Sequence, residues 1–160
     1  MSIDRIHEKV LELLLAEPGW RSWTRYLDIG AGRGTLIARV KEKLNVETSV
    51  CDYTEELMRL PGQKADVANL NHESLPYPDA SFDVVTATEV IEHLEDFRRV
   101  VREIHRVLKP GGAVFVSVPA YQWLWSQNDR TAHDCRRYTA KRLRAVLRRT
   151  DPTLSRLRPL

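Results

Sequence analysis

The chain has 160 residues, 42% of them hydrophobic, and a formal net charge of +3 at pH 7. This length and apolar content predict one domain with its own hydrophobic core. The sequence has no apolar run of about 18 residues and does not open with a signal-peptide pattern, so we expect a cytoplasmic protein without a membrane-spanning helix. Cys51 and Cys135 have neither the spacing of metal ligands nor the context of a disulfide.

The charge is distributed unevenly along the chain. Residues 130–160 carry ten Lys and Arg and two Asp and Glu, a balance of +8, whereas residues 1–129 sum to −5. A basic helix exposed to solvent is the favoured explanation. The alternative is a face that meets nucleic acid, nucleotide sugars or a polyanionic lipid.

Hydrophobic periodicity predicts helices that alternate with strands. In chain order, the expected elements are a helix over 2–16, a strand over 26–29, a helix ending at residue 44, a strand over 47–52, a short helix over 54–60, a strand near 65–68, a strand over 82–87, a helix from about 96 to 108 and a strand over 113–118. The Pro-Gly-Gly sequence at 110–112 is expected to end the last helix. This alternation predicts an α/β fold with a doubly wound, Rossmann-like parallel sheet, which binds ligands at the carboxyl ends of its strands.

A glycine-rich turn joins the first expected strand to the next helix. Its sequence, from Asp28 to Gly34, is Asp-Ile-Gly-Ala-Gly-Arg-Gly. Gly30 and Gly32 can adopt backbone angles closed to other residues and let a ligand approach the main chain. The first turn of the helix offers N–H groups to an anion. Because a carboxylate inside a strand is costly to bury without partners, we expect Asp28 to orient the turn or to meet a cationic ligand.

Asp52 ends the second expected strand, about twenty residues beyond the glycines. In a nucleotide-binding βαβ unit, an acidic residue at this position accepts hydrogen bonds from both ribose hydroxyls. The alternative is that Asp52 caps the short helix expected over 54–60. We favour the ribose-binding role.

Two further motifs follow in order. They are Leu-Pro-Tyr-Pro-Asp-Ala-Ser-Phe-Asp-Val-Val over residues 75–85 and Arg-Glu-Ile-His-Arg-Val-Leu-Lys-Pro-Gly-Gly-Ala over residues 102–113. Together with the glycine turn, they resemble the class I S-adenosylmethionine-dependent methyltransferases, type 11 branch, across about residues 25–118. A dehydrogenase more usually carries Gly-x-Gly-x-x-Gly, whereas Gly34 comes one residue earlier.

The resemblance implies a single methyltransferase domain over residues 1–160 with sheet order 3-2-1-4-5. It implies methyl transfer from S-adenosylmethionine to a small or medium acceptor. For the adenine base it implies Asn69 and Leu70, with Asp66 as second choice, since the amide oxygen of Asn69 can replace the usual carboxylate. The cofactor-binding residues implied in full are Asp28, Gly30, Ala31, Gly32, Asp52, Tyr53, Asn69, Leu70 and Thr88.

An aromatic segment follows the last expected strand and resembles a subgroup of bacterial type 11 enzymes in which it precedes His-x-x-Arg-Arg-Tyr. A loop of about twenty residues is unusual unless it has a function. His133 is the candidate general base, and the candidate substrate contacts are Tyr121, Trp125, Arg137 and Tyr138. The alternative is that the Trp side chains pack against the sheet and His133 only holds the loop.

Residues 89–93, Glu-Val-Ile-Glu-His, resemble the metal motif of small-RNA 2′-O-methyltransferases and of some ubiquinone-pathway O-methyltransferases. Glu89, Glu92 and His93 lie within about one helical turn and could converge on a divalent ion, with His133 as a fourth ligand. Many type 11 enzymes carry Glu-His here without a metal, so we expect none. The alternative functions are a metal-assisted RNA 2′-O-methyltransferase and a cofactor-binding module without activity.

The end of the sequence is short for this family. A complete class I methyltransferase adds strands 6 and 7 after a helix expected here at about 139–149, and only residues 151–160 follow it. We therefore expect both strands to be missing, which leaves the strand over 113–118 with an open edge, a template for pairing with another chain. The expectation is either a fragment of a longer chain or a homodimer that covers this edge.

Overall fold

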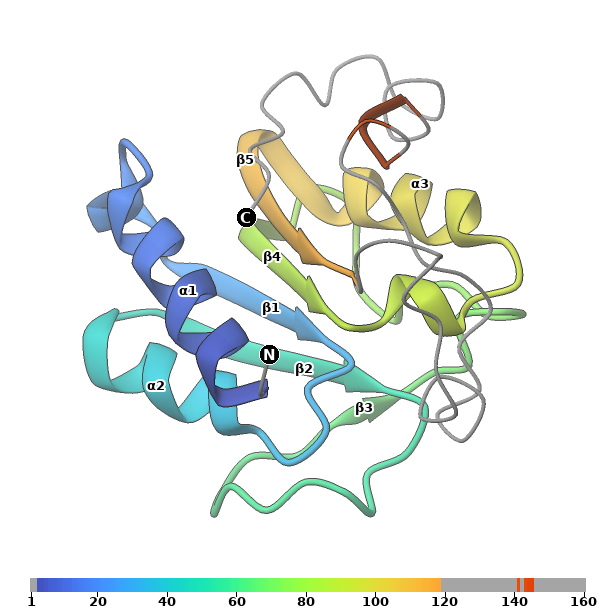
Figure 1. The fold of residues 1–160 in the computed structure, drawn as a ribbon, viewed down its shortest axis with the longest axis horizontal. Coiled ribbons are helices and arrows are strands. Elements are labelled where there is room, and N and C mark those ends of the chain that lie inside the picture. Colours follow the sequence, from blue (N-terminus) through green and yellow to red (C-terminus); the bar gives the residue numbers. More distant parts are fainter. Residues whose placement is uncertain (1–2, 119–140, 142, 146–160) are drawn as a thin grey trace.

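Helices and strands alternate along the chain (Figure 1). The computed structural model describes residues 3–118, 141 and 143–145. Its elements are α1 (Ile3–Ala16), the short 3-10 helix η1 (Trp20–Ser22), β1 (Arg25–Ile29), α2 (Thr35–Lys43), β2 (Glu47–Asp52), β3 (Asp66–Val67), β4 (Phe82–Thr88), the 3-10 helix η2 (Ile91–His93), α3 (Phe97–Val107) and β5 (Leu108–Ser117). The α/β prediction is confirmed.

The strands form one parallel sheet in the order β3-β2-β1-β4-β5. β1 lies at its centre, where Asp28 is the register partner of Val50 on β2 and of Thr86 on β4. Helices α1 and α2 cover one face of the sheet, and α3 covers the other (Figure 1). The doubly wound arrangement and the strand order are therefore as predicted.

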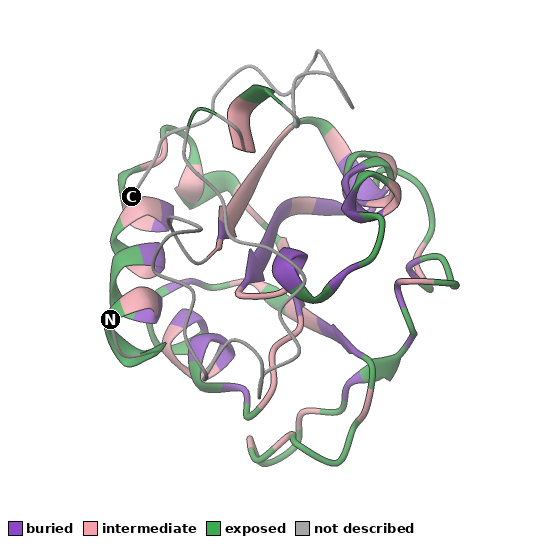
Figure 2. Ribbon diagram, turned by 45° about the vertical axis from the view of Figure 1, so that its right-hand side comes forward, coloured by how far each residue is buried: buried purple, intermediate pink, exposed green. Residues whose placement is uncertain are grey.

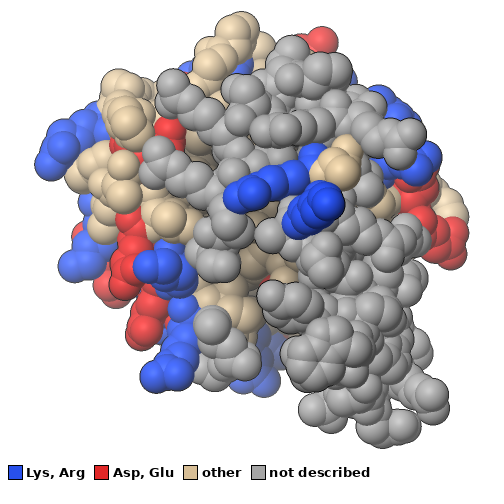
Figure 3. All heavy atoms as spheres, turned by 45° about the horizontal axis from the view of Figure 1, so that its top comes forward, with Lys and Arg blue, Asp and Glu red and all other residues tan. Residues whose placement is uncertain are grey.

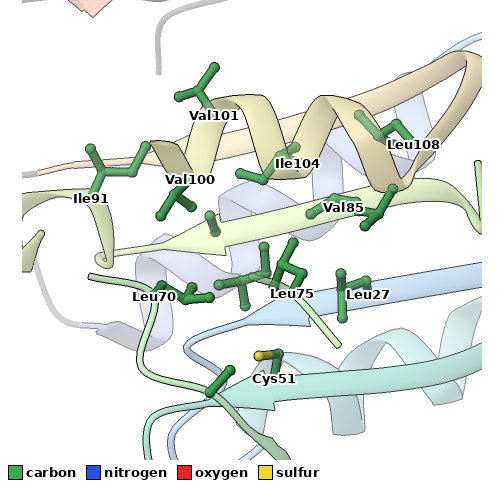
Figure 4. Close-up of a cluster of buried hydrophobic side chains, with 14 of the residues drawn as sticks. Leu27, Cys51, Leu70, Leu75, Val85, Ile91, Val100, Val101, Ile104 and Leu108 are labelled. Atoms are coloured by element: carbon green, nitrogen blue, oxygen red, sulfur yellow. The ribbon is translucent and has the colours of Figure 1, made fainter. Parts of the chain in front are cut away.

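A hydrophobic core lies on each face of the sheet. Because successive residues of a strand point to opposite faces, Leu27 and Ile29 pack on the α3 side and Tyr26 packs on the side of α1 and α2. Figure 4 shows the α3 side, with Val100 and Ile104 of α3 turned toward the sheet. Buried residues run along the central strands (Figure 2). Burial on both faces holds the strand ends in fixed relative positions.

Most of the expected elements are confirmed to within one residue at either end, and β2 has the predicted bounds. The helix expected at 96–108 is α3, and Asp96 caps it by accepting a hydrogen bond from the N–H of Arg98 over 3.1 Å. A polar cap and an apolar helical stripe define such an element locally. These elements therefore follow from the sequence around them.

The short helix expected over 54–60 is wrong, because this segment forms turns. The hydroxyl of Thr54 accepts from the N–H of Glu56 over 3.2 Å, and the N–H of Arg59 donates to the carbonyl of Arg33 over 3.3 Å. Met58 packs so closely on the glycine turn that a Cβ on Gly34 would lie 2.8 Å from its sulfur. A segment of this length gains little from helix formation, so side-chain and tertiary contacts decide its path.

β5 begins earlier than predicted. α3 ends at Val107 and β5 starts at Leu108, so the Pro-Gly-Gly sequence expected to separate helix and strand lies inside the strand. The ladder with β4 shifts its register there. Gly112 approaches β4 so closely that a Cβ would lie 3.0 Å from the carbonyl oxygen of Asp83. An irregular outer strand of this kind accommodates a proline.

The helix expected at about 139–149 is described in part. Residues 141 and 143–145 are helical, and Leu143 packs against the core on the α3 side. Among the described residues, no helix is both long and apolar enough to cross a membrane. The single domain over 1–160, the missing strands 6 and 7 and the homodimer stay predictions.

Candidate functional site

The carboxyl ends of β1, β2 and β4 bring together residues that the sequence singled out. The glycine turn follows β1, Asp52 closes β2 and Thr88 closes β4. Because the strands are parallel, these carboxyl ends all lie at the same end of the sheet (Figure 1). Open parallel sheets bind their ligands at the carboxyl ends of their strands.

Glycine is the one residue type that fits position 30, at the start of the turn. Its φ is 70°, and its N–H donates to the carbonyl oxygen of Cys51 on β2 over 2.8 Å. A Cβ at this position would lie 2.3 Å from Cγ2 of Val90. Both the backbone angle and the contact with Val90 therefore exclude a side chain.

The main chain at Gly32 faces open space. A Cβ there would meet no atom of the described residues within 4 Å, and the N–H of Gly32 donates to Oδ2 of Asp52 over 2.9 Å. Ala31 closes the turn by accepting from the N–H of Gly34 over 2.8 Å. Helix α2 then begins at Thr35, so the N–H groups of its first turn have no acceptor within the helix. This main chain beside a helix N-terminus suits a carboxylate.

Asp52 is buried and has both oxygens in position. Oδ2 meets Gly32, and Oδ1 accepts from the N–H of Tyr53 over 2.7 Å. Each carboxylate oxygen has further lone pairs, so both can still accept from neighbouring hydroxyls. Tyr53, the residue next to this carboxylate, is 71% exposed. The alternative role of Asp52 as a helix cap is wrong, because residues 54–60 form no helix.

Asp28 belongs to a buried polar network below the turn. Its Oδ1 accepts from the hydroxyl of Thr86 over 2.6 Å, and the hydroxyl of Tyr26 lies 2.6 Å from the same Thr86 oxygen. Burial raises the pKa of Asp28 to about 7, and the charge of Asp52 adds to the rise. A cation that approached the turn would favour the ionised carboxylate. The expected role of Asp28 in orienting the turn fits this network.

His7 is a residue of this region that the sequence analysis missed. It lies on α1, is buried, and its Nδ1 is 2.8 Å from the hydroxyl of Thr35 at the start of α2. Burial, followed by the charge of Arg39, lowers the pKa of His7. The signal was present, since His7 shares the buried face of α1 with Val10 and Leu14. Through this contact with Thr35, His7 of α1 fixes the position of the N-terminus of α2.

The two candidate adenine positions differ in their contacts. Asn69 is exposed, and its side-chain oxygen accepts from the N–H of Asn71 over 3.1 Å, whereas Leu70 is buried in the core. Asp66 is bound by the hydroxyl of Tyr77 over 2.7 Å. The amide oxygen of Asn69 therefore accepts one hydrogen bond and has a second lone pair for an adenine amino group, while Asp66 is engaged by Tyr77.

The residues of the possible metal motif after β4 have separate surroundings in the described part of the chain. Oε1 of Glu89 accepts from the hydroxyl of Ser117 over 2.8 Å, Glu92 is buried with 1% exposed, and His93 is exposed. Among the described residues, no three His, Cys, Asp or Glu side chains are grouped to hold a metal ion. Thr88, at the end of β4, has a buried hydroxyl without a hydrogen-bond partner in the described part of the chain.

The predicted acceptor residues His133, Tyr121, Trp125, Arg137 and Tyr138 lie outside the described residues. So does most of the basic segment 130–160. On the surface that is described, basic and acidic side chains lie close to one another (Figure 3), as where Arg39 pairs with Asp4 over 3.1 Å. The acceptor site and the nucleic-acid face stay predictions.

A parallel sheet of this order, with a glycine turn and an acidic residue on adjacent strand ends, is the arrangement of Rossmann-like nucleotide-binding folds. A family model described as a methyltransferase domain, Methyltransf_11, matches residues 27–116, more than half of the chain. The chain belongs to this family, the type 11 branch of the S-adenosylmethionine-dependent methyltransferases. The predicted resemblance is confirmed.

Two relatives show how far the similarity extends. The 27-O-demethylrifamycin SV methyltransferase of Amycolatopsis mediterranei is 34% identical over 113 residues, which cover 62% of this chain and 42% of that protein. The ubiquinone/menaquinone biosynthesis C-methyltransferase UbiE of Pseudoalteromonas translucida is 27% identical over 122 residues, 69% of this chain and 49% of that protein. The chain thus spans less than half the length of these curated relatives.

Solved structures agree with the fold. The YcgJ protein from Bacillus subtilis has a TM-score of 0.73 at 26% identity and covers 90% of this chain, which spans 67% of that one. Phosphoethanolamine N-methyltransferase 2 of Haemonchus contortus, solved with S-adenosyl-L-methionine, has a TM-score of 0.71 at 18% identity and covers 90% of this chain and 36% of its own. At that identity the second likeness shows the fold alone.

Proposed function

We propose that this chain binds S-adenosylmethionine at the glycine turn and transfers its methyl group to a small or medium-sized acceptor. One observation carries the proposal above all. The N–H of Gly32 and the carboxylate of Asp52 are hydrogen-bonded to each other, and a Cβ on Gly32 would meet no atom of the described residues within 4 Å. Family membership supports the choice of cofactor.

The described residues fit this cofactor in their chemistry. Gly32 leaves an approachable main chain, and Thr88 holds a buried hydroxyl whose hydrogen bond is not made within the described residues. A buried hydroxyl without a partner is costly, and a ligand would remove that cost. The site therefore offers groups for a ligand to complete.

We assign a role to each described residue of the proposed cofactor site. Asp52 accepts from the two ribose hydroxyls, and the exposed ring of Tyr53 lies against the adenine. Asn69 and Leu70 border the base, while the turn from Gly30 to Gly32 receives the amino-acid part of the cofactor. Asp28, beneath the turn, favours the cationic amino group of that part.

When bound, the sulfonium cofactor supplies an activated methyl group with a good leaving group. The chain's part is then to align the acceptor atom and to exclude water from it. We assign this part to the segment after Ser117, with His133 taking a proton from an acceptor that is poorly ionised. Tyr121, Trp125, Arg137 and Tyr138 would contact the acceptor.

A small acceptor is favoured over RNA. Relatives of this chain act, by their names, on 27-O-demethylrifamycin SV and in ubiquinone/menaquinone biosynthesis. The metal arrangement that would favour the RNA enzyme is not found among the described residues. We keep a cytoplasmic location as part of the proposal.

Calorimetry with S-adenosylhomocysteine, followed by transfer of labelled methyl groups to a panel of small acceptors and to RNA, tests the proposal. We expect binding with one site per chain and transfer to a small acceptor that persists in the presence of a chelator. Binding without transfer to any acceptor would support a silent module. Transfer to RNA that a chelator abolishes and magnesium restores would support the metal-assisted alternative.

A further inference from the structure

The residue after β4 is bound twice by the last residue of β5. The N–H of Glu89 donates to the carbonyl oxygen of Ser117 over 3.1 Å, and the hydroxyl of Ser117 donates to Oε1 of Glu89 over 2.8 Å. Ser117 is buried and is the register partner of Thr88. Glu89 therefore extends the pairing of the two strands by one residue and adds a side-chain bond.

Glu89 has an unusual backbone conformation. Its φ is 54°, in the left-handed region that Gly and Asn adopt more readily than a residue with a long side chain. Such conformations cost free energy and persist where surrounding contacts hold them. The two hydrogen bonds between Glu89 and Ser117 are contacts of this kind, and the one to the glutamate carboxylate is an interaction that glycine could not make.

The next residue, Val90, packs on the glycine turn. Its Cγ2 occupies the space in which a Cβ on Gly30 would lie, at 2.3 Å. The N–H of Gly30 is in turn bound to the carbonyl of Cys51 over 2.8 Å. A continuous series of contacts thus runs from Ser117 through Glu89 and Val90 to the turn.

We propose that Glu89 is a positioning residue that, while bound to Ser117, holds Val90 against Gly30 and so keeps the glycine turn in the conformation that receives the cofactor. The identity of that cofactor rests on the proposed function, whereas the contacts do not. Glu89 acts here through Val90.

The first test is binding of S-adenosylhomocysteine, measured by calorimetry. Glu89→Ala and Ser117→Ala should each weaken binding by roughly tenfold, while Glu89→Gln, whose amide oxygen still accepts from Ser117, should stay within about twofold. Glu47→Ala is the matched control, because it removes the same charge at the amino end of β2. Glu89→Gln as weak as Glu89→Ala would mean that the charge itself contacts the ligand, and unchanged Ala variants would remove the role altogether.

A double-mutant cycle with Val90→Ala tests the route. If Glu89 acts through Val90, Glu89→Ala should add little to the loss of affinity already caused by Val90→Ala. Independent, additive losses would overturn the proposal. A merely structural weakening of the fold would give additive losses in the same way, so the cycle separates the two roles.

A second measurement needs no ligand. Hydrogen exchange of the Gly30 and Gly32 amides in the free protein should be about tenfold faster in Glu89→Ala and Ser117→Ala, and unchanged in Glu89→Gln and Glu47→Ala. Equal exchange in all variants would overturn the positioning role. If the wild-type chain failed to bind S-adenosylhomocysteine, the proposed function would fail while this measurement would still decide the role of Glu89.

Discussion

The N–H of Gly32 donates a hydrogen bond to Oδ2 of Asp52 over 2.9 Å, which ties the turn after β1 to the end of β2. The two parts of the proposed cofactor site are therefore in position before a ligand arrives. An arrangement formed in advance lowers the ordering cost of binding. The bond also explains the position of this acidic residue. At the end of β2, Asp52 lies beside the turn that follows β1.

Asp52→Ala should weaken binding of S-adenosylhomocysteine by about 1.5–3 kcal/mol, roughly 10–150-fold, because two hydrogen bonds to a charged group are lost. Calorimetry measures the change. Asp79→Ala is the control, since it also removes one carboxylate, at an exposed ion pair with Arg106. Unchanged affinity in Asp52→Ala would remove this residue from the site.

Gly30→Ala should destabilise the chain by about 2–4 kcal/mol, because the new Cβ meets Val90 and the backbone angle is unfavourable. Gly62→Ala is a matched control with a similar φ of 75° and no atom of the described residues within 4 Å of its Cβ. Urea denaturation gives both values. Equal losses in the two variants would mean that contact with Val90 does not matter.

The pKa of Asp28, raised by burial to about 7 from 3.8, makes stability depend on pH. The folded chain holds this proton more tightly than the unfolded chain, so the contribution is fully present below about pH 4 and is lost as the pH rises through 7. Asp28→Asn keeps an acceptor for Thr86 and cannot ionise. The free energy of unfolding of the wild type, relative to this variant, should fall by about 2–3 kcal/mol between pH 5 and pH 7.

Denaturation of both proteins at several pH values measures that difference. Asp52 and Tyr26 are the ionisable groups that act on or share the network of Asp28, and both remain in the variant. Their own titration therefore largely cancels in the comparison. A difference that stays constant from pH 5 to pH 8 would contradict the raised pKa.

Asp83 joins β1, β4 and β5 near their amino ends, at the end of the sheet opposite the glycine turn. Its Oδ2 accepts from the N–H groups of Thr24 and Arg25, each over 2.9 Å, and its Oδ1 accepts from Lys109 over 2.9 Å. Burial alone would raise its pKa, but these hydrogen bonds hold the pKa of Asp83 at about 2. The stabilisation is therefore present above about pH 4 and is lost as the pH falls toward 2.

Asp83→Ala should cost about 2–4 kcal/mol of unfolding free energy at pH 7, because several charge-assisted bonds are lost. Asp79→Ala, at an exposed ion pair, should cost less than about 1 kcal/mol. Urea denaturation of both variants at pH 7 provides the comparison. Equal costs would show that Asp83 does not hold the strands together.

The α/β sheet was predictable because most of its strands carry a local pattern, and its strand order followed from the family resemblance. β2 has an apolar second half that ends at Asp52, and α3 has both a cap at Asp96 and a continuous apolar stripe. Motif spacing then placed the glycine turn and Asp52 on adjacent strand ends. Local patterns of this kind predict the folded structure because the contacts in the core favour the same conformations.

Other features depend on contacts between distant residues. Residues 54–60 turn because Met58 packs on Gly34, and β5 starts at Leu108 because its ladder with β4 is irregular. The bond between Glu89 and Ser117 depends on the register of two strands, 28 residues apart in sequence. No local pattern encodes such a contact, and for Glu89 the motif resemblance offered only the metal-ligand alternative, which the sequence did not favour.

If the chain binds S-adenosylmethionine at the glycine turn, titration of the isotope-labelled chain with S-adenosylhomocysteine, followed by NMR of the backbone amides, should show it. We expect saturable shifts of the Gly30, Gly32 and Tyr53 amides, none of comparable size at the amino end of the sheet around Thr24, and no such response to NADH. Unchanged amides at the glycine turn, or equal shifts with the nicotinamide cofactor, would contradict an S-adenosylmethionine site at this turn.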